Sequence, residues 1–368
     1  MRATQASMPT LILTMIAGLA SASANRPNHS RPNEHLADRS ANQKSLQAEP
    51  ISATHSVADP TEGLFIDSFE EGLALDARNI RIDLPGGAYL PGRLYVPAQS
   101  AGAAVVMVHG CSGLWSDGLP WTIAQGAIER WGWKLAESGY LAIAIDSYTS
   151  RTPELVDPLD FQTQCTGDTY AGAVDPYTTR VADMDTAIAW LRYHFGPKAT
   201  NHLGALGWSQ GGQSVLVRSA ETYRDANVPR FVDAADEATA QIASVVFYPG
   251  CGTFLGFIDE FAIEDSYWRP HRDLVINHGG DDPLHVSCSK RAEIAVAGYD
   301  ATSDSGHWAR YIEYPNARHS FDNAIDEWPD APCSANATPD DACAARKADI
   351  TSFEFLSTRL GTVAAHSE

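Results

Sequence analysis

Short runs of apolar residues recur along the chain and predict the strands of a buried sheet. Residues 103–108 and 140–145 are apolar at every position, the pattern of a strand covered on both faces. Residues 79–84 alternate between apolar and polar side chains, and a PGG turn separates them from an apolar run at 90–96, which predicts a strand pair at the sheet edge. Further strands are predicted at residues 202–206, 241–247, 273–277 and 308–314.

Segments between these runs place apolar residues three and four positions apart, the spacing of one helix face. One predicted helix spans residues 122–138 and ends at Gly139, a second spans 180–194, and a third spans 344–360. Strands alternating with helices predict an α/β fold with a mostly parallel central sheet and helices on both faces. Ligands of such sheets bind beyond the carboxyl ends of the strands, so we look there for chemistry.

The N-terminal 63 residues differ in character from the rest. Arg2 precedes a short apolar stretch, and the small residues ASA at 22–24 resemble a cleavage site, so residues 1–24 are predicted to be a signal peptide. A membrane anchor is the alternative, but the apolar stretch is shorter than the roughly 20 residues that span a bilayer. Residues 25–63 are polar and predict a disordered leader. We therefore expect a secreted or periplasmic protein with one folded domain at residues 64–368.

Charge and cysteine content narrow the possible classes of protein. The formal net charge of -20 argues against nucleic-acid and anionic-membrane partners, which require basic surfaces. The chain has 6 cysteines, an even number that indicates disulfides in an exported protein, with buried free thiols as the alternative. The sequence contains no Cys-x-x-Cys spacing, which argues against a metal site formed by cysteines. The order of the segments suggests the pairs Cys111–Cys165, Cys251–Cys288 and Cys333–Cys343.

The motif GWSQG at 207–211 lies between a predicted strand and a helix. A sharp strand-to-helix turn crowds the backbone around its central residue, and glycine on both sides relieves that crowding. The hydroxyl of Ser209 is then exposed above the sheet, where the N–H groups of the following helix also point. This context predicts that Ser209 is a nucleophile rather than a structural serine.

A serine nucleophile needs a base to take its proton and an acid to orient that base. The strand end at 274–283 runs into Asp281 and Asp282, and a later strand end runs into His319. Nucleophile, acid and histidine follow one another in the chain order typical of this architecture. We predict Asp282 as the acid, with Asp281 as its close competitor, and His319 as the base. The neighbouring histidines lack the spacing of a metal site, so neither metal nor cofactor is expected.

The oxyanion formed during acyl transfer needs hydrogen-bond donors. Gln210, the residue after the nucleophile, supplies one backbone N–H, and the loop HGCSG at 109–113 supplies another, from Cys111 or alternatively Ser112. His109 is expected to brace this loop. Four aromatic residues follow strand ends or flank the motif, and either line the substrate pocket or fill the core: Trp115, Trp121, Tyr148 and Trp208.

Together these motifs resemble the dienelactone hydrolase family of the α/β-hydrolase superfamily over residues 79–360. The resemblance rests on HGCSG at 109–113, DSYTSR at 146–151, GWSQGG at 207–212, YPGC at 248–251, HGGDDP at 278–283 and ARHSF at 317–321. It implies an α/β-hydrolase fold with Ser209, Asp282 and His319 as the triad. Dienelactone hydrolases proper have cysteine as the nucleophile and hold a substrate carboxylate with arginines. Here Arg151 stands near one such position, but Asn323 stands four residues after the histidine.

These features predict an exported serine ester hydrolase that acts on a small-molecule ester through an acyl-enzyme, without a cofactor. Substrate-contacting candidates are Trp115, Tyr148, Arg151 and Trp208. A dienelactone-type lactone hydrolase, or a peptidase or acyltransferase on the same scaffold, remains an alternative. A non-catalytic binding protein that has kept the fold is a further one. The sequence specifies neither the natural ester nor the oligomeric state.

Overall fold

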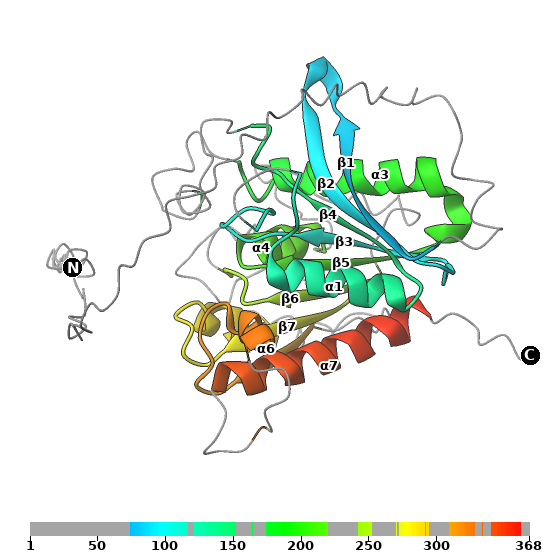
Figure 1. The fold of residues 1–368 in the computed structure, drawn as a ribbon. Coiled ribbons are helices and arrows are strands. Elements are labelled where there is room, and N and C mark those ends of the chain that lie inside the picture. The colour runs from blue at the N-terminus through cyan, green and yellow to red at the C-terminus, as the bar shows by residue number, and fades with distance from the viewer. Residues whose placement is uncertain are drawn as a thin grey trace, which may run out of the picture. The chain divides into compact units, whose positions relative to one another are not determined.

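The strands form a single eight-stranded sheet within the described part of the computed structural model (Figure 1). The structure describes residues 74–116, 121–151, 164, 174–219, 242–251, 270, 272–290, 292–293, 309–327, 333 and 340–361. The predicted signal peptide and polar leader lie outside these residues. The strands are β1 (Asp76–Asp83), β2 (Tyr89–Val96), β3 (Ala103–Val108), β4 (Leu141–Ile145), β5 (His202–Trp208), β6 (Ala243–Phe247), β7 (Asp273–Gly279) and β8 (Ala309–Tyr314).

The order of strands across the sheet is β1-β2-β4-β3-β5-β6-β7-β8. The β1–β2 and β2–β4 pairs are antiparallel, as the predicted edge hairpin requires, and all other neighbours are parallel. Parallel strands present their carboxyl ends at one edge, so the loops that follow β3, β5, β6, β7 and β8 meet there. The chain therefore has the predicted α/β-hydrolase fold, with β5 near the middle of the sheet.

Helices cover both faces of the sheet (Figure 1). On one face, α1 (Gly126–Glu137) packs against β2 and β4, and α7 (Asp340–Leu360) packs against β5, β6 and β7; this layer of the core includes Val105 and Met107 of β3. On the other, α3 (Thr179–Ala199) and α4 (Gln210–Arg218) pack against Val106 and Val108. The inner strands β3 and β4 thus bury both their odd and even positions, which explains their continuous apolar sequences, whereas the edge strands β1 and β8 are mostly exposed or half-buried.

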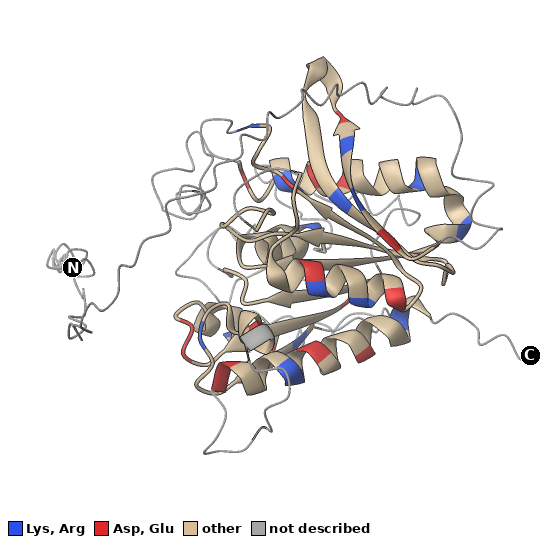
Figure 2. Ribbon diagram, in the orientation of Figure 1, with Lys and Arg blue, Asp and Glu red and all other residues tan. Residues whose placement is uncertain are grey.

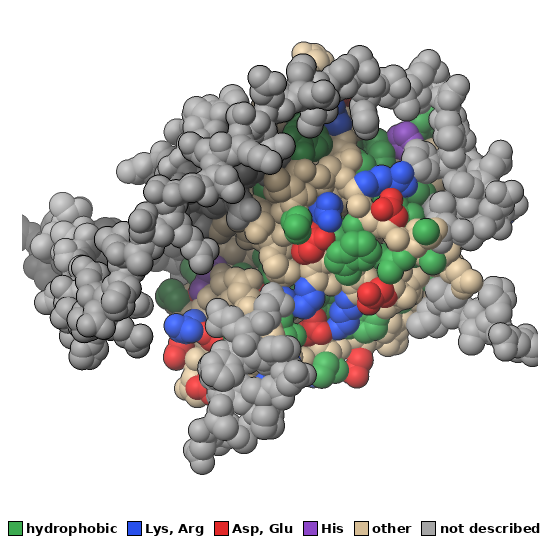
Figure 3. Space-filling view, in the orientation of Figure 1, with side chains coloured by type: hydrophobic (Ala, Val, Ile, Leu, Met, Phe, Trp, Pro, Cys, Tyr) green, Lys and Arg blue, Asp and Glu red, His purple; other side chains and the backbone are tan. Residues whose placement is uncertain are grey.

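The outer surface of the α1 and α7 layer is polar and carries both signs of charge. Figure 2 places acidic and basic residues on these two helices, and Figure 3 shows them intermixed with apolar side chains on this face. Lys134 of α1 forms an ion pair with Asp349 of α7. Beneath it, Trp131 is fully buried against Phe247, and removal of its apolar surface from water contributes about 1.5–3 kcal/mol to the stability of the fold.

Three helix boundaries differ from the pattern-based prediction, among them the start of α7 at Asp340 rather than residue 344. The first helix begins at Gly126 rather than residue 122, because Trp121 has a positive φ of 71° and Ala124 is engaged in a β-bridge with Trp115. In α3, Gly196 (φ 71°) breaks the helical backbone as expected, but one more turn follows it and ends at Ala199.

The cysteines confirm one predicted pair and correct another. Cys251 and Cys288 form a disulfide, as predicted. Cys111 is also disulfide-bonded, and Cys165 lies outside the described residues. The expected Cys333–Cys343 bond is wrong for this structure: both are free thiols, and Cys333 Sγ accepts a hydrogen bond from Arg346. Within the described ranges, no helix is both long and apolar enough to cross a membrane.

Candidate active site

Ser209 lies on the turn between β5 and α4, in a backbone conformation that side chains rarely adopt. Its φ and ψ are 49° and -117°. The turn is possible because glycines stand two residues before and two residues after Ser209: a Cβ on Gly207 would lie 2.6 Å from the Gly211 carbonyl oxygen. A Cβ on Gly211 would lie 2.1 Å from the Val108 carbonyl oxygen. The two glycines thus let the strand end, the helix and the loop after β3 approach one another closely.

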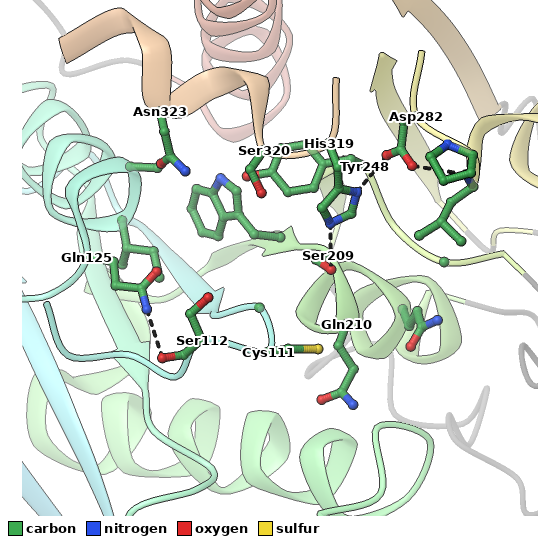
Figure 4. Close-up of a pocket in the computed structure, with 18 residues that line it drawn as sticks. Cys111, Ser112, Gln125, Ser209, Gln210, Tyr248, Asp282, His319, Ser320 and Asn323 are labelled. Atoms are coloured by element: carbon green, nitrogen blue, oxygen red, sulfur yellow. Dashed lines mark hydrogen bonds and ion pairs between the residues drawn. The ribbon is translucent and has the colours of Figure 1, made fainter. Parts of the chain in front are cut away.

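Three polar side chains from separate loops form a continuous hydrogen-bonded chain (Figure 4). Ser209 Oγ lies 3.1 Å from His319 Nε2, and His319 Nδ1 lies 2.7 Å from Asp282 Oδ2. His319 follows β8, and Asp282 follows β7. The distances fit a serine whose proton passes to an imidazole held by a carboxylate.

Asp282 is buried, whereas the competing candidate Asp281 is exposed. Burial opposes ionisation of Asp282, but the nearby His278 ring and hydrogen bonds from His319 and the Leu284 N–H outweigh it and hold the pKa of this carboxyl below its usual value. His278 Nδ1 lies 3.3 Å from Asp282 Oδ2. Asp282 is therefore ionised at neutral pH and can fix the orientation of His319.

The Ser209 hydroxyl opens into a cavity of about 550 Å³, within the size range of small-molecule sites. Apolar and uncharged polar side chains form most of its wall around the Ser-His-Asp chain. Figure 4 shows Gln125 and Asn323 on the side of the cavity away from Asp282. The lining residues used below are Cys111, Ser112, Trp208, Gln210, Gln213, Tyr248, Gly250 and Asn323.

Two candidate oxyanion donors lie next to Ser209. Gln210 is the first residue of α4, so its backbone N–H has no partner within that helix. Cys111 and the alternative Ser112 both line the cavity. His109 is fully buried, and burial, together with the charge of Arg180, holds the pKa of its imidazole well below the usual value. Its neutral ring bonds the Gly110 carbonyl and accepts from the Ser147 N–H, consistent with a bracing role.

The predicted substrate contacts fall into different environments. Trp208 lines the cavity. Trp115 and Tyr148 are fully buried and lie outside the cavity lining; Trp115 donates to Asp146 and Tyr148 donates to Gln210. Arg151 forms a two-pronged ion pair with Asp183 and also donates to the Ser147 carbonyl.

The sequence reasoning missed a buried acid behind His319. Asp322 accepts from Trp208 Nε1 at 2.8 Å and from the Tyr248 hydroxyl at 2.5 Å, and it is 1% exposed. Burial raises the pKa of this carboxyl, against the effect of those hydrogen bonds. The Tyr248 ring packs on His319, with centroids 4.7 Å apart. Asp322 thus ties together the residue before Ser209, the end of β6 and the histidine loop.

No cluster of three or more histidine, cysteine or acidic side chains that could hold a metal ion occurs among the residues that the structure describes.

The only sequence signal for the missed residues was their position after a strand end or after His319. Tyr248 follows β6 directly, and Asp322 and Asn323 follow His319 within four residues. Nothing in the sequence indicated their partners.

Comparisons with known proteins place the chain in a family. The search of the curated proteins gave no match. An esterase from Thermogutta terrifontis is 18% identical, with 77% of this chain and 94% of that chain covered and a TM-score of 0.47. A Pyrococcus furiosus esterase is 14% identical, with 78% and 94% covered and a TM-score of 0.47. The dienelactone hydrolase family model matches residues 90–360. The chain therefore belongs to the dienelactone hydrolase family.

Proposed function

We propose that this protein is an exported serine hydrolase of uncharged carboxylic esters. The observation that carries the proposal is the Ser209–His319–Asp282 chain at the wall of a cavity that also contains the Gln210 and Cys111 backbones. Membership of a hydrolase family supports it. A binding protein would have no need of a nucleophile, a base and an acid arranged in this order.

The first half-reaction forms an acyl-enzyme. Asp282 accepts a hydrogen bond from the Nδ1–H group of His319, which leaves the Nε2 lone pair facing the Ser209 hydroxyl. Ser209 Oγ attacks the ester carbonyl carbon while His319 takes its proton, and the N–H groups of Gln210 and Cys111 stabilise the oxyanion. The intermediate then breaks its bond to the alkoxide, which leaves as the alcohol after protonation by His319.

The second half-reaction repeats these steps with water. His319 takes a proton from water, and the resulting hydroxide attacks the acyl carbon through the same oxyanion site. The bond to Ser209 Oγ then breaks, and His319 returns the proton to the serine. The products are one acid and one alcohol, and no other group is consumed.

The charges around the cavity favour an uncharged substrate. The Arg151 guanidinium is already paired with Asp183, and the residue four after His319 is the neutral Asn323. Arginine or lysine does not occur among the described residues that line the cavity. A substrate carboxylate would therefore lose hydration without gaining a cationic partner, which is unfavourable.

Export is the second part of the proposal. The predicted signal peptide at residues 1–24 supports it, and so does the Cys251–Cys288 disulfide, since such bonds persist mainly in oxidising compartments. N-terminal sequencing of protein secreted from its host tests this part. The expected first residue is Asn25, whereas an intact Met1 would contradict cleavage.

Hydrolysis of p-nitrophenyl acetate, butyrate and octanoate tests the chemistry. Ser209→Ala should abolish turnover and labelling by a fluorophosphonate while the circular dichroism spectrum stays unchanged. Ser289→Ala is the matched control and should retain both, because Ser289 is half-buried outside the cavity lining and its hydroxyl donates to the Val286 carbonyl. Full activity in the Ser209→Ala variant would refute the assignment.

The preference for neutral substrates needs a separate comparison. Methyl butyrate and monomethyl succinate have similar size but differ by a carboxylate, and a pH-stat follows both. We expect at least about tenfold higher kcat/KM for methyl butyrate, a difference of about 1.4 kcal/mol. Asn323→Arg should narrow that ratio, and Asn323→Gln should not. Equal rates on both esters in the wild type would refute the charge argument.

A further inference from the structure

Arg180 of α3 is a buried cation beneath the two loops that line the nucleophile. Its side chain is 0% exposed. The guanidinium donates from Nη2 to the His109 carbonyl at 2.5 Å and from Nη1 to Gln210 Oε1 at 2.8 Å. Those two acceptors belong to the loop after β3 and to the first residue of α4. One side chain therefore bridges both segments that supply the candidate oxyanion donors.

Both polar atoms of the Gln210 side chain form hydrogen bonds. Its Oε1 also accepts from the Tyr148 hydroxyl, and its Nε2 donates to the Gln164 carbonyl at 2.8 Å. The Arg180 guanidinium lies over the Tyr148 ring, 5.1 Å from its centroid. The Gln210 side chain is thus fixed in one orientation, away from the cavity, while its backbone N–H stays beside Ser209.

The electrostatic setting of Arg180 is unusual. Within the described ranges, no carboxylate forms an ion pair with its guanidinium, and its Nε has no hydrogen-bond partner. Burial lowers the pKa of this arginine, but a guanidinium remains charged in proteins. The carboxylates of Asp183 and Asp146 attract this charge without a direct ion pair, and removing a charge from water with no carboxylate in contact is unfavourable. A buried positive charge beneath the loops around Ser209 would stabilise the negative charge that develops there during acyl transfer.

We propose that Arg180 is a positioning residue for the oxyanion hole. It holds the loop at 109–113 and the start of α4 at a fixed separation, so that the Cys111 and Gln210 N–H groups converge on one point. Its charge adds to the positive potential of that point, where low dielectric makes it effective. This inference rests on the proposed ester hydrolysis, because the oxyanion exists only in that reaction.

The test compares Arg180→Lys with a matched buried arginine. Arg218→Lys is the control: Arg218 is 2% exposed on the neighbouring α4 and pairs with Asp185 of α3. Rates on p-nitrophenyl butyrate are expressed per site titrated with a fluorophosphonate. The inhibition constant of butylboronic acid, which forms a tetrahedral adduct with a serine, reports on stabilisation of the oxyanion geometry.

We expect Arg180→Lys to lower kcat about 10- to 100-fold with KM within about threefold of wild type, since losing a whole oxyanion donor lowers kcat about 10²–10³-fold. The inhibition constant for butylboronic acid should rise by a similar factor. Arg218→Lys should change neither. An Arg180→Lys variant with wild-type kcat and boronate affinity would overturn the inference, as would an equal loss in Arg218→Lys.

A second variant covers the case in which Arg180→Lys fails to fold. Gln210→Ala keeps the backbone N–H but removes the acceptor of Arg180, and should also lower kcat more than it raises KM. Wild-type kcat in Gln210→Ala would overturn the inference too. Activity that survives in Ser209→Ala would instead refute the proposed function, and the two failures are therefore distinguishable.

Discussion

Substitution of Gly211 by alanine tests whether close contact between α4 and the loop after β3 maintains the site. An added Cβ would lie 2.1 Å from the Val108 carbonyl oxygen and 2.4 Å from the His109 carbonyl oxygen. Real Cβ atoms essentially never approach closer than 3.0 Å, so the helix start and the loop must separate by about 0.9 Å. Both obstructing atoms are backbone, and Arg180 restrains the loop through the same His109 carbonyl.

The expected effect follows from that separation. Overpacking of this kind costs typically about 1–3 kcal/mol of folding free energy. Displacement of a catalytic group by about 1 Å can lower the rate about 10²-fold. Because Gly211 follows Gln210 in α4 and packs against the start of the loop that contains Cys111, we expect kcat/KM to fall by roughly that factor while the protein still folds.

The matched control is Gly250→Ala. Its added Cβ would lie 2.0 Å from Gln213 Nε2, nominally as close, but the obstructing atom is the end of a flexible side chain. The Gln213 side chain can rotate into the cavity, so the loss of stability should stay below about 1 kcal/mol. Urea unfolding followed by tryptophan fluorescence gives the free energies, and p-nitrophenyl butyrate gives the rates. A Gly211→Ala variant as stable and active as Gly250→Ala would refute the reasoning.

Three further predictions concern charge, covalent bonds and buried polar groups. The pKa of Asp282 is lowered in the folded protein, so the stabilisation from its ionised form is present above the unfolded pKa of about 4 and is lost as the pH falls below it. The difference in free energy of unfolding between wild type and Asp282→Asn, measured by urea titration, should therefore become smaller below pH 4. Replacing Cys251 and Cys288 by alanine should lower the free energy of unfolding by about 4 kcal/mol, since the sequence separation is 37 residues, and an unchanged urea midpoint would contradict it. Tyr248→Phe should cost about 1–3 kcal/mol because it removes a donor from buried Asp322, and calorimetry measures it.

Apolar patterning predicted the inner strands β3 and β4 well because they are buried on both faces. Residues 103–108 match β3 in full, and Gly207 and Gly211, the glycines of the GWSQG turn, stand where contacts with backbone atoms forbid a side chain. These features depend on local sequence and on the general rules of parallel sheets. The same rules bring the ends of β5, β7 and β8 together, and with them Ser209, Asp282 and His319.

Pairwise partners across the fold could not be predicted in the same way. Arg180 and Gln210 are 30 positions apart, and Trp208 and Asp322 are 114 apart. A buried arginine on a helix reads in the sequence as an ordinary exposed one. Tyr148 likewise followed a strand end, as a cavity residue would, but its hydroxyl bonds Gln210 behind the cavity wall. Such choices depend on side-chain packing, which a single sequence does not reveal.

The position of β8 makes hydrolysis a measure of complete folding. Ser209 follows a strand near the middle of the sheet, whereas His319 follows β8, the strand at its edge. Edge elements open with less free energy than central ones, and a local opening there separates the base from its serine 110 positions away. Activity is therefore expected to disappear at lower urea than the tryptophan signal of the core, and to be the last property that a refolding chain recovers.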